Sequence, residues 1–342
     1  MKRRHATLSD IAKALNVSAS TVSRALHDSP LIGKETKDSV ISMAKALNYR
    51  PNQQAIGLLN KKTKIIGVIV PEITGYFFAT AINGLQDFVE NTGYKLIIGQ
   101  SNESFDQEAK LMETLSLARV DGLIISPTSE TTSNIHLENF RESGIPVVVF
   151  DRDCPHFLSD KVFVDDYEGA FQAVNYLIKT GCRRIAHLGG PGNLTTCRCR
   201  KRGYLDALIQ NGIRQDPQLI LEVSGFTPDC GEEAIRDLLN REAIPDAIFA
   251  VNDAVAIGTM PVILEKGLRI PQDISLIGFD DEPYSRFFKP SLTSVWQPVY
   301  ELGLLSGRIL MNHILCSPED YTYRREILKP ELVLRQSSKP LM

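Results

Sequence analysis

Apolar residues recur at helical spacing in three stretches of the first fifty positions. In the first stretch the apolar positions are Leu8, Ile11, Ala12 and Leu15. Thr7 and Asp10 have the spacing of a capping box, and Asn16-Val17 breaks the pattern before Ser18 can cap a second helix. In the third stretch, residues 34–47, the inward stripe is expected to consist of Val40, Ile41, Ala44 and Leu47. The pattern predicts a compact three-helix head.

The second predicted helix has two faces of different chemistry. The face that can pack against the first helix consists of Val22, Ala25 and Leu26. The opposite face consists of Ala19, Ser20, Ser23 and Arg24. Small and polar side chains on the N-terminal half of an exposed helix suit base readout in the major groove of DNA. The alternative is an ordinary helical hairpin with a solvated polar face, and these residues alone leave it open.

A short linker segment follows the three helices. Pro51 ends an extended link, and residues 53–60 come next. An isolated helix of this length is marginal in water, so the segment should become helical only against a partner. Its apolar side chains are Ala55, Ile56, Leu58 and Leu59.

From Lys64 onward, apolar strand-like runs alternate with helical stretches in two consecutive series. The first series has runs at 65–70, 95–98, 122–125 and 147–150, with helices expected at about 77–91, 105–118 and 134–143. The second has runs at 162–164, 185–188, 219–223, 247–250 and 275–278. Such alternation predicts an α/β fold with parallel sheets. Two series predict two similar lobes with a cleft between them.

Polar and aromatic residues directly follow these runs. They are residues 76–78, 151–152, 194–200, 226, 252–253 and 279–281. Ligands of open α/β sheets bind at the carboxyl ends of the strands, so these residues are the candidate site. Aromatic rings, arginines, carboxylates and an amide suit a small ligand with hydroxyl groups and a flat apolar side. A sugar fits this description, and a sugar phosphate is the close alternative because arginine also suits phosphate.

Charge is distributed unevenly along the chain. The whole chain has a net charge of −3, but its first 62 residues contain eleven Lys and Arg against four Asp and Glu. This segment therefore carries +7 and leaves −10 for the remainder. A basic N-terminal module attracts phosphates, whereas an acidic remainder discourages the rest of the chain from lying on DNA. The two parts should have different partners.

The remaining composition excludes several classes. The length of 342 residues and 43% hydrophobic content suit two or three domains. Neither an export signal nor a membrane-spanning run is evident, so a cytoplasmic protein is expected. Cys197 and Cys199 are too close for a usual zinc pair, and Gly189-Gly190-Pro191-Gly192 lacks the spacing of a nucleotide-binding loop. No metal, no cofactor and no catalytic residue is expected.

Several distinctive motifs are spread along the chain, namely TLSDIAKALNVSASTVSRALH, LNYRPN, RVDGLIISP, FAVNDAVAIG, RIPQDISLIGFDDEP, LTSVWQP and PELVLRQSS. Together they resemble the lactose-repressor/galactose-repressor (LacI/GalR) family of bacterial transcription factors. The resemblance runs nearly end to end. It implies a helix-turn-helix DNA-binding headpiece (1–50), a hinge helix and linker (51–63), and a core like periplasmic sugar-binding proteins. The expected N-terminal lobe of the core covers 64–162 and 293–322, and the C-terminal lobe covers 163–292 and 323–342.

The resemblance also implies roles for individual residues. The DNA-binding positions are Ser18, Ala19, Ser20, Thr21, Ser23 and Arg24 on or beside the second helix, and Asn52, Ala55 and Leu58 in the linker. Leu58 is the expected minor-groove wedge, which would kink the duplex. The effector-binding positions are Phe77, Phe78, Asp151, Arg152, Thr196, Arg200, Phe226, Asn252 and Asp280. Phe77 and Phe78 could instead be core residues, Asp280 could be a turn or cap residue, and Asp281 is expected to be structural.

Three features depart from the family pattern. Leu194 occupies a position where some relatives have a polar ligand-binding residue, and Cys197 and Cys199 flank a position usually filled by small residues. Pro261 should interrupt the helix after Asn252, because an interior proline removes a backbone hydrogen bond. The expected function is a homodimeric repressor that binds a palindromic operator in double-stranded DNA and responds to a small effector. The alternatives are a sugar-binding transport receptor and an α/β sugar-processing enzyme.

Overall fold

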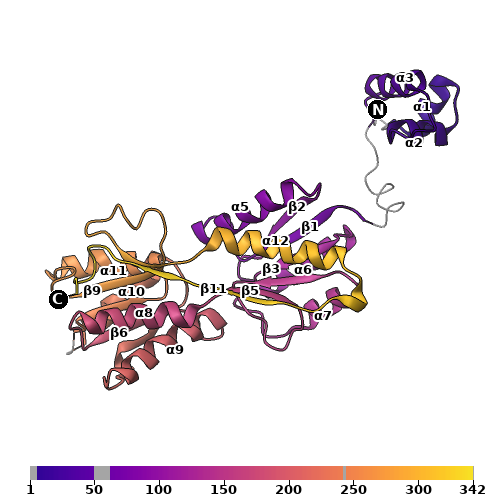
Figure 1. The fold of residues 1–342 in the computed structure, drawn as a ribbon. Helices are drawn as coiled ribbons and strands as arrows, with labels where there is room; N and C mark the ends of the chain where they lie inside the picture. Colours follow the sequence, from indigo (N-terminus) through magenta and orange to yellow (C-terminus); the bar gives the residue numbers. More distant parts are fainter. Residues whose placement is uncertain (1–5, 50–61, 242–243, 342) are drawn as a thin grey trace. The chain divides into compact units, whose positions relative to one another are not determined.

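The structure is a computed structural model that describes residues 6–49, 62–241 and 244–341. The chain divides at Thr63 into two compact units, a headpiece and a core. Figure 1 shows the helices of the described part of the headpiece and the α/β architecture of the core. A helical headpiece followed by an α/β core confirms the predicted fold class.

Three short helices form the headpiece, namely α1 (Leu8–Leu15), α2 (Ala19–Leu26) and α3 (Lys34–Ala46). The backbone N–H of Thr7 donates to Oδ2 of Asp10 at 2.8 Å, and the N–H of Asp10 donates to Oγ1 of Thr7 at 3.3 Å. The predicted capping box is therefore confirmed. Ser18 caps α2 by accepting from the N–H of Thr21 at 3.0 Å. The centre of the headpiece is formed by the fully buried side chains of Ile11, Val22 and Val40.

The predicted inward stripe of α3 is partly wrong. Val40 and Ala44 are buried, but Ile41 is 41% exposed and Leu47 is 39% exposed. Met43 packs against the headpiece core in their place. The reasons are geometric, because Ile41 is rotated about 100° around the helix from Val40, and Leu47 lies at the C-cap, beyond the last residue of α3.

Two six-stranded sheets form the core, one in each lobe. The first-lobe sheet has the order β11-β5-β4-β3-β1-β2 and the second has β12-β10-β9-β8-β6-β7. The first-lobe strands are β1 (Ile65–Val70), β2 (Lys95–Gln100), β3 (Gly122–Ile125), β4 (Val147–Phe150), β5 (Asp160–Val164) and β11 (Arg325–Leu328). The second-lobe strands are β6 (Ile185–Gly189), β7 (Ile220–Glu222), β8 (Ala247–Ala250), β9 (Ser275–Asp280), β10 (Thr293–Trp296) and β12 (Glu331–Val333). Among these strands, only the pairing of β10 with β12 is antiparallel.

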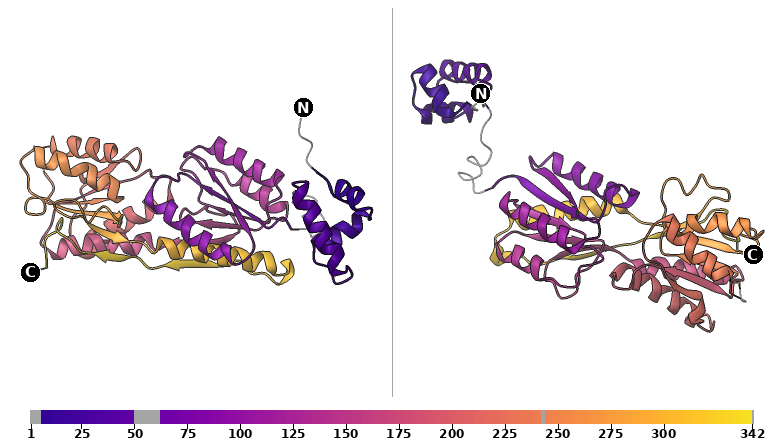
Figure 2. Two further views of the ribbon diagram at one scale, coloured as in Figure 1. Left: turned by 90° about the horizontal axis from the view of Figure 1, so that it is seen from above. Right: turned by 180° about the vertical axis from the view of Figure 1, so that it is seen from behind.

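Helices cover both faces of each sheet, as the two views in Figure 2 show. The first lobe contains α5 (Tyr76–Glu90), α6 (Phe105–Leu117), α7 (Ile135–Glu142) and α12 (Val299–Leu315). The second contains α8 (Asp166–Lys179), α9 (Thr195–Gln210), α10 (Pro228–Leu239) and α11 (Asp253–Glu265). Two 3₁₀ turns lie at Pro217–Leu219 and Pro318–Asp320. The central strands of both sheets are therefore buried, as parallel strands require, whereas edge strands such as β2 and β11 are more exposed.

The chain crosses between the lobes at other residues than the sequence predicted. Residues 163–164 end β5 in the first sheet, and residues 293–296 form β10, which pairs with β9 in the second sheet. Residues 325–328 form β11, which pairs with β5 in the first sheet. The crossovers therefore follow β5, β10 and β11. The expected boundary at 162 falls inside β5, which continues to Val164, and those at 293 and 322 differ because β10 and β11 are four-residue strands without a long apolar run.

Glycines allow two helix pairs to approach closely, one pair in each lobe. In the first lobe, an added Cβ at Gly84 would clash with the carbonyl oxygen of Tyr300, and one at Gly303 would clash with that of Ala81. These glycines lie on α5 and α12. In the second lobe, a Cβ added at Gly231 on α10 or at Gly258 on α11 would likewise clash with backbone of the facing helix. Backbone cannot move aside as a flexible side chain can, so these positions require glycine.

Substitution of Gly303 by alanine should lower the free energy of unfolding of the core by about 3 kcal/mol, because overpacking forces the two helices apart. Thermal unfolding of the full chain measures the effect. Asn312→Ala is the matched control, since Asn312 is exposed on the same helix and should change stability by less than about 0.5 kcal/mol. Equal melting temperatures for Gly303→Ala and the wild type would contradict the close packing of α5 and α12.

Pro261 does not interrupt its helix, contrary to the prediction. α11 runs continuously from Asp253 to Glu265 with Pro261 inside it. Pro261 lies on the exposed side of α11, and the carbonyl that loses its backbone hydrogen bond belongs to Ile257, which is only partly buried. The rest of the helix is held by its buried residues in the second-lobe core.

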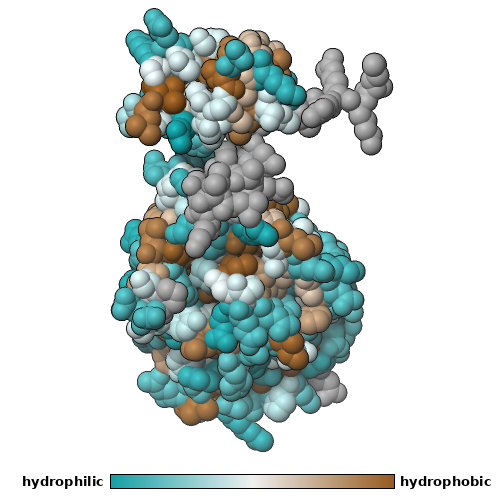
Figure 3. Space-filling model, turned by 90° about the vertical axis from the view of Figure 1, so that its right-hand side faces the viewer, coloured by the Kyte–Doolittle hydropathy of each residue, from teal (hydrophilic) through white to brown (hydrophobic). Residues whose placement is uncertain are grey.

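None of the helices in the described residues is long and apolar enough to cross a membrane. On the face in Figure 3, hydrophobic residues lie among hydrophilic ones. Apolar burial is instead concentrated around the two sheets.

Candidate functional site

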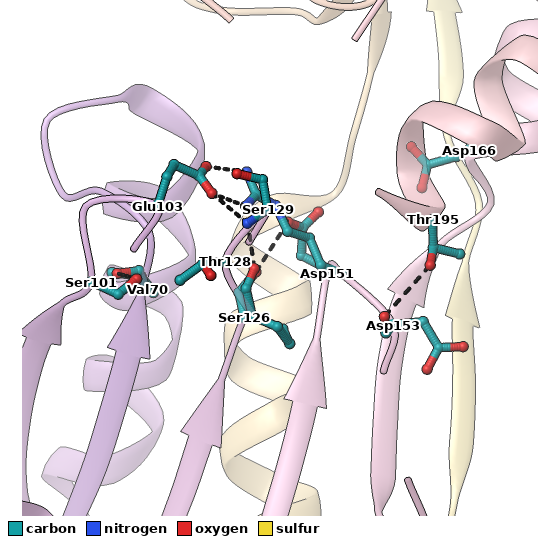
Figure 4. A network of polar contacts seen from close by, with 12 residues as sticks. Val70, Ser101, Glu103, Ser126, Thr128, Ser129, Asp151, Asp153, Asp166 and Thr195 are labelled. Atoms are coloured by element: carbon teal, nitrogen blue, oxygen red, sulfur yellow. Dashed lines mark hydrogen bonds and ion pairs between the residues drawn. The ribbon is translucent and has the colours of Figure 1, made fainter. Parts of the chain in front are cut away.

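Side chains from both lobes meet at the carboxyl ends of the strands. In Figure 4, Glu103, Ser126, Ser129 and Asp151 lie on the first-lobe side, and Asp166 lies across from them at the start of α8. Contacts join the lobes here. The hydroxyl of Thr195 donates to the carbonyl of Asp153 at 3.5 Å, and the amide of Asn193 donates to the carbonyl of Ser129. We call this region the interlobe site.

Arg152 is the first of two buried arginines in the interlobe site. Its Nη1 and Nη2 each donate to Glu103 at 2.8 Å, and Nη1 also donates to the carbonyl of Pro127 at 3.2 Å. Burial opposes the ionisation of Glu103, but these bonds to Arg152 outweigh it and lower the pKa of Glu103. The guanidinium is 5.9 Å from the ring centre of Phe78 and 5.7 Å from that of Phe226. Because Phe78 and Phe226 belong to different lobes, Arg152 contacts both.

Arg200 is the second buried arginine, and α9 carries it. Its Nε donates to Asp166 at 2.7 Å, its Nη1 donates to the carbonyl of Val251 at 2.6 Å, and its guanidinium stacks 3.7 Å from the ring centre of Phe279. Burial alone would lower the pKa of Arg200, but Asp166 and Asp280 hold that pKa above its usual range. Arg200 is therefore charged, with most of its bonding capacity used inside the second lobe.

Two carboxylates of the interlobe site lie near the arginines without a hydrogen bond to them. Asp280 accepts from Nε2 of Gln297 at 2.6 Å and lies 3.9 Å from Nη1 of Arg200. Burial raises the pKa of Asp280 to about 8, although Arg200 counteracts this. Asp151 accepts from the hydroxyl of Ser126 at 3.3 Å and lies 3.8 Å from Nε of Arg152. Burial raises the pKa of Asp151 to about 6. Both groups therefore change charge within the physiological pH range.

The backbone holds both aspartates in an unusual conformation. The φ angle is 62° at Asp151 and 108° at Asp280, in the left-handed region that most side chains avoid. Such strain persists where the surroundings over-determine it, often at ligand sites.

The predicted aromatic residues divide between core and site. Phe78 is buried in the first-lobe core and packs edge-on against Phe150, with ring centres 6.1 Å apart. Phe77 is only partly buried and packs against the same core. Phe226 is partly buried beside Arg152. Phe77 and Phe226 are therefore the rings with exposed surface.

Two predicted polar residues have mainly local bonds. Asn252 caps α11, because its Oδ1 accepts from the N–H of Val255 at 2.9 Å, while its Nδ2 donates to the carbonyl of Phe226 at 3.2 Å. Thr196 is buried in the first turn of α9. Asn252 therefore positions Phe226 in addition to any contact with a ligand.

Sequence reasoning missed the partners of both arginines. Asp166 follows β5 directly, so the rule used for the other candidates would have included it. Glu103 lies beyond β2 after a short turn, and Gln297 follows β10, which no apolar run announced. Asp281, expected to be structural, bonds Nη1 of Arg335 at 2.5 Å and is structural in this fold.

The departures from the family pattern lie in the second-lobe core. Leu194 and Cys197 are buried among its apolar residues, and a Cβ added at Gly190 would lie 2.7 Å from Sγ of Cys197. All six cysteines are free. No group of His, Cys, Asp or Glu in the described part of the chain could hold a metal ion.

The headpiece presents the predicted DNA-reading face on α2. Ala19, Ser20 and Arg24 are exposed, whereas Ser23 and Thr21 are partly buried. The hydroxyl of Ser18 bonds the hydroxyls of Ser20 at 2.7 Å and Thr21 at 2.8 Å. Ser18 therefore orders the start of the helix. The linker candidates Asn52, Ala55 and Leu58 lie outside the described residues.

Comparison with known proteins covers both units. Residues 7–52 match the model of bacterial regulatory proteins of the lacI family, and residues 63–334 match that of periplasmic binding proteins and sugar binding domain of the LacI family. The HTH-type transcriptional repressor PurR of Haemophilus influenzae (strain PittEE) is 34% identical, over 98% of this chain and 100% of the relative.

Two solved structures are also similar. A complex of the transcriptional regulator CelR with cellobiose is 28% identical, with a TM-score of 0.74, over 97% of this chain and 100% of the other. A LacI family regulator from Enterococcus faecium with bound ribose is 30% identical, with a TM-score of 0.71, over 81% of this chain and 100% of the other.

Proposed function

Because the chain belongs to the LacI family of bacterial regulatory proteins, we propose that it is a repressor whose dimer binds a palindromic operator and responds to a sugar in the interlobe site. Family membership makes it a DNA-binding transcription regulator rather than an enzyme or a transport receptor. The observation that carries the proposal is the pairing of an exposed polar face on α2 with a buried polar site that joins two lobes. Its DNA target implies action in the cytoplasm.

The chemistry of the interlobe site supports a sugar. Phe77 and Phe226 offer apolar ring surface, while Asp151 and Asp280 offer oxygens that accept hydrogen bonds from hydroxyl groups. The similar regulators with cellobiose and with ribose support the same class of ligand.

A second copy of the chain is the expected partner of the first lobe. β2 lies at an edge of its sheet, and its Ile97 and Ile98 are 42% and 43% exposed. An unpaired edge with exposed isoleucines is a liability unless another surface covers it. A dimer with twofold symmetry would bring two headpieces to the two halves of a palindrome.

The ligand would act by changing the relative orientation of the lobes. It can do so only through different affinities for the two arrangements. Arg152, which contacts a ring of each lobe, would sense that change directly.

The DNA-binding part of the proposal is tested by selecting an operator from random duplexes with the full chain, followed by substitution of Arg24. The selected site should be palindromic and bind two chains. Arg24→Ala should weaken operator binding tenfold to hundredfold, about 1–3 kcal/mol, and affect random DNA much less. Fluorescence anisotropy at fixed salt measures both.

Lys13→Ala is the matched control, because Lys13 is an exposed cation on α1 rather than α2. It should weaken binding to the operator and to random DNA similarly, as the loss of a phosphate contact does. An equal loss on both DNAs for Arg24→Ala would exclude Arg24 from base reading.

A further inference from the structure

We infer that the ligand of the interlobe site carries no anionic group, so it is a neutral or amino-substituted sugar rather than a sugar phosphate or sugar acid. This inference rests on the proposed function, since it concerns the ligand of the same site. The argument depends on which charges of the site are already paired.

Both arginines are occupied by the protein itself. Arg152 makes a two-pronged ion pair with Glu103, and Arg200 makes two 2.7 Å contacts with Asp166. Each guanidinium also donates to a backbone carbonyl, of Pro127 and Val251 respectively. An anionic ligand would have to compete with these buried carboxylates for the same charge.

Two other cations of this region are also occupied. Nζ of Lys161 is 2.5 Å from Asp153 and donates to the carbonyl of Cys154 at 2.9 Å. Arg198 donates to the carbonyls of Gly192 and Asn193 and to the hydroxyl of Thr195. Neither cation is available to a ligand without the loss of existing bonds.

Carboxylates exceed cations around the site. Beyond the pairs with Glu103 and Asp166, Asp151 and Asp280 share the same two arginines at 3.8 and 3.9 Å, and Asp253 and Glu282 remain. Asp253 is satisfied by the hydroxyls of Ser285 and Ser294, both at 2.5 Å, and by the N–H of Glu282 at 2.9 Å. The surplus that a ligand would meet therefore consists of Asp151, Asp280 and Glu282.

Glu282 is the least satisfied of these groups. It is only 8% exposed, and its Oε2 has no hydrogen-bond partner among the described residues. Burial raises the pKa of Glu282 to about 7, and the charges of Asp280 and of Glu72 in the first lobe raise it further. The pKa of Glu282 is therefore raised by a carboxylate from each lobe. A ligand that donates hydrogen bonds would satisfy such a group, whereas an anion would repel it.

Helix dipoles provide the opposing contribution. α5, α6, α9 and α10 begin at this edge of the sheets, and none of these starts has a side-chain cap. Each helix start is equivalent to roughly half a positive charge, and its effect falls off within the first turn. These partial charges do not replace a free cation. An anionic ligand would still compete with Glu103 and Asp166 for Arg152 and Arg200.

The test is a binding panel with the full-length protein. Glucose, galactose, mannose and ribose are each compared with the corresponding sugar phosphate, and the three hexoses also with the 2-amino sugar and the uronic acid. Isothermal titration calorimetry at pH 7.5 measures the affinities. In whichever series binds, the phosphate and the acid should bind at least tenfold more weakly than the neutral sugar. The amino sugar should bind at least as tightly.

Glu282→Gln removes one carboxylate charge and keeps the shape of the side chain. It should reduce the preference for neutral over anionic sugar at least threefold. Asp237→Asn, which removes an exposed carboxylate on α10, should leave that preference unchanged.

An anionic sugar that binds as tightly as its neutral parent would overturn the inference while leaving the proposed regulator intact. A panel without any binder would overturn both the inference and the proposed sugar response. Operator binding by the same preparation would remain as a separate result.

Discussion

Replacement of Arg200 by alanine is expected to lower the free energy of unfolding of the core by about 3–5 kcal/mol, the largest effect on stability among the substitutions considered. The substitution leaves Asp166 buried without its cation and the carbonyl of Val251 without its donor. It also removes the guanidinium that stacks on Phe279. Chemical denaturation of the full chain, followed by circular dichroism, measures the loss.

Two further variants separate the ion pair from general damage to α9. Arg202→Ala, on the same helix but with a side chain 71% exposed, should cost less than about 1 kcal/mol. The double substitution Arg200→Met with Asp166→Asn should lose less stability than Arg200→Ala, because no unpaired charge remains buried. A double variant as unstable as Arg200→Ala would show that the loss comes from packing alone.

Substitution of Asp280 by alanine is expected to abolish the response to ligand while ligand-free DNA affinity stays within about twofold. Loss of a buried hydrogen-bonding group that contacts the ligand weakens binding by about 1–3 kcal/mol, or roughly fivefold to hundredfold. The DNA-reading residues are on α2, in the other compact unit, so operator affinity without ligand should be retained. Operator binding titrated with the sugar found in the panel measures the response.

The pH dependence of the same variant provides an internal check. Burial raises the pKa of Asp280 to about 8, so its carboxylate becomes ionised as the pH rises through that value. An ionised carboxylate accepts stronger hydrogen bonds from hydroxyl groups, so affinity for a neutral sugar, which does not titrate in this range, should rise from pH 7 to pH 8.5 in the wild type and rise less in Asp280→Asn. If Asp280→Ala still releases or binds the operator at the wild-type sugar concentration, Asp280 does not contact the ligand.

Much of the secondary structure could be predicted from local sequence. Thr7 with Asp10 and Ser18 mark the starts of α1 and α2, and Asn16 ends α1 with a positive φ of 55°. These signals act within one helical turn, so they need no distant partner. Long apolar runs likewise marked β1 and β9 correctly, because strands buried on both faces must be continuously apolar.

Short or partly exposed elements could not be predicted in this way. β10, β11 and β12 have three or four residues each, and β11 has no buried residue. Their hydrogen bonds come from neighbouring strands, so they exist only once the sheets have formed. The exposure of Ile41 and the uninterrupted helix around Pro261 also follow from which surfaces meet other parts of the chain.

The sequence by itself determined that aromatic rings, arginines and aspartates would gather where the strands end. Only the tertiary structure decided which of them neutralise one another. Arg152 pairs with Glu103, 49 residues away, and Arg200 pairs with Asp166, 34 residues away. Local pattern contains no information on such pairs, because they depend on how two sheets bring distant segments together. With that pairing, Asp151 and Asp280 lie 3.8 and 3.9 Å from the same arginines, and one oxygen of Glu282 has no hydrogen-bond partner among the described residues. The inferred preference for a ligand without an anionic group rests on this arrangement.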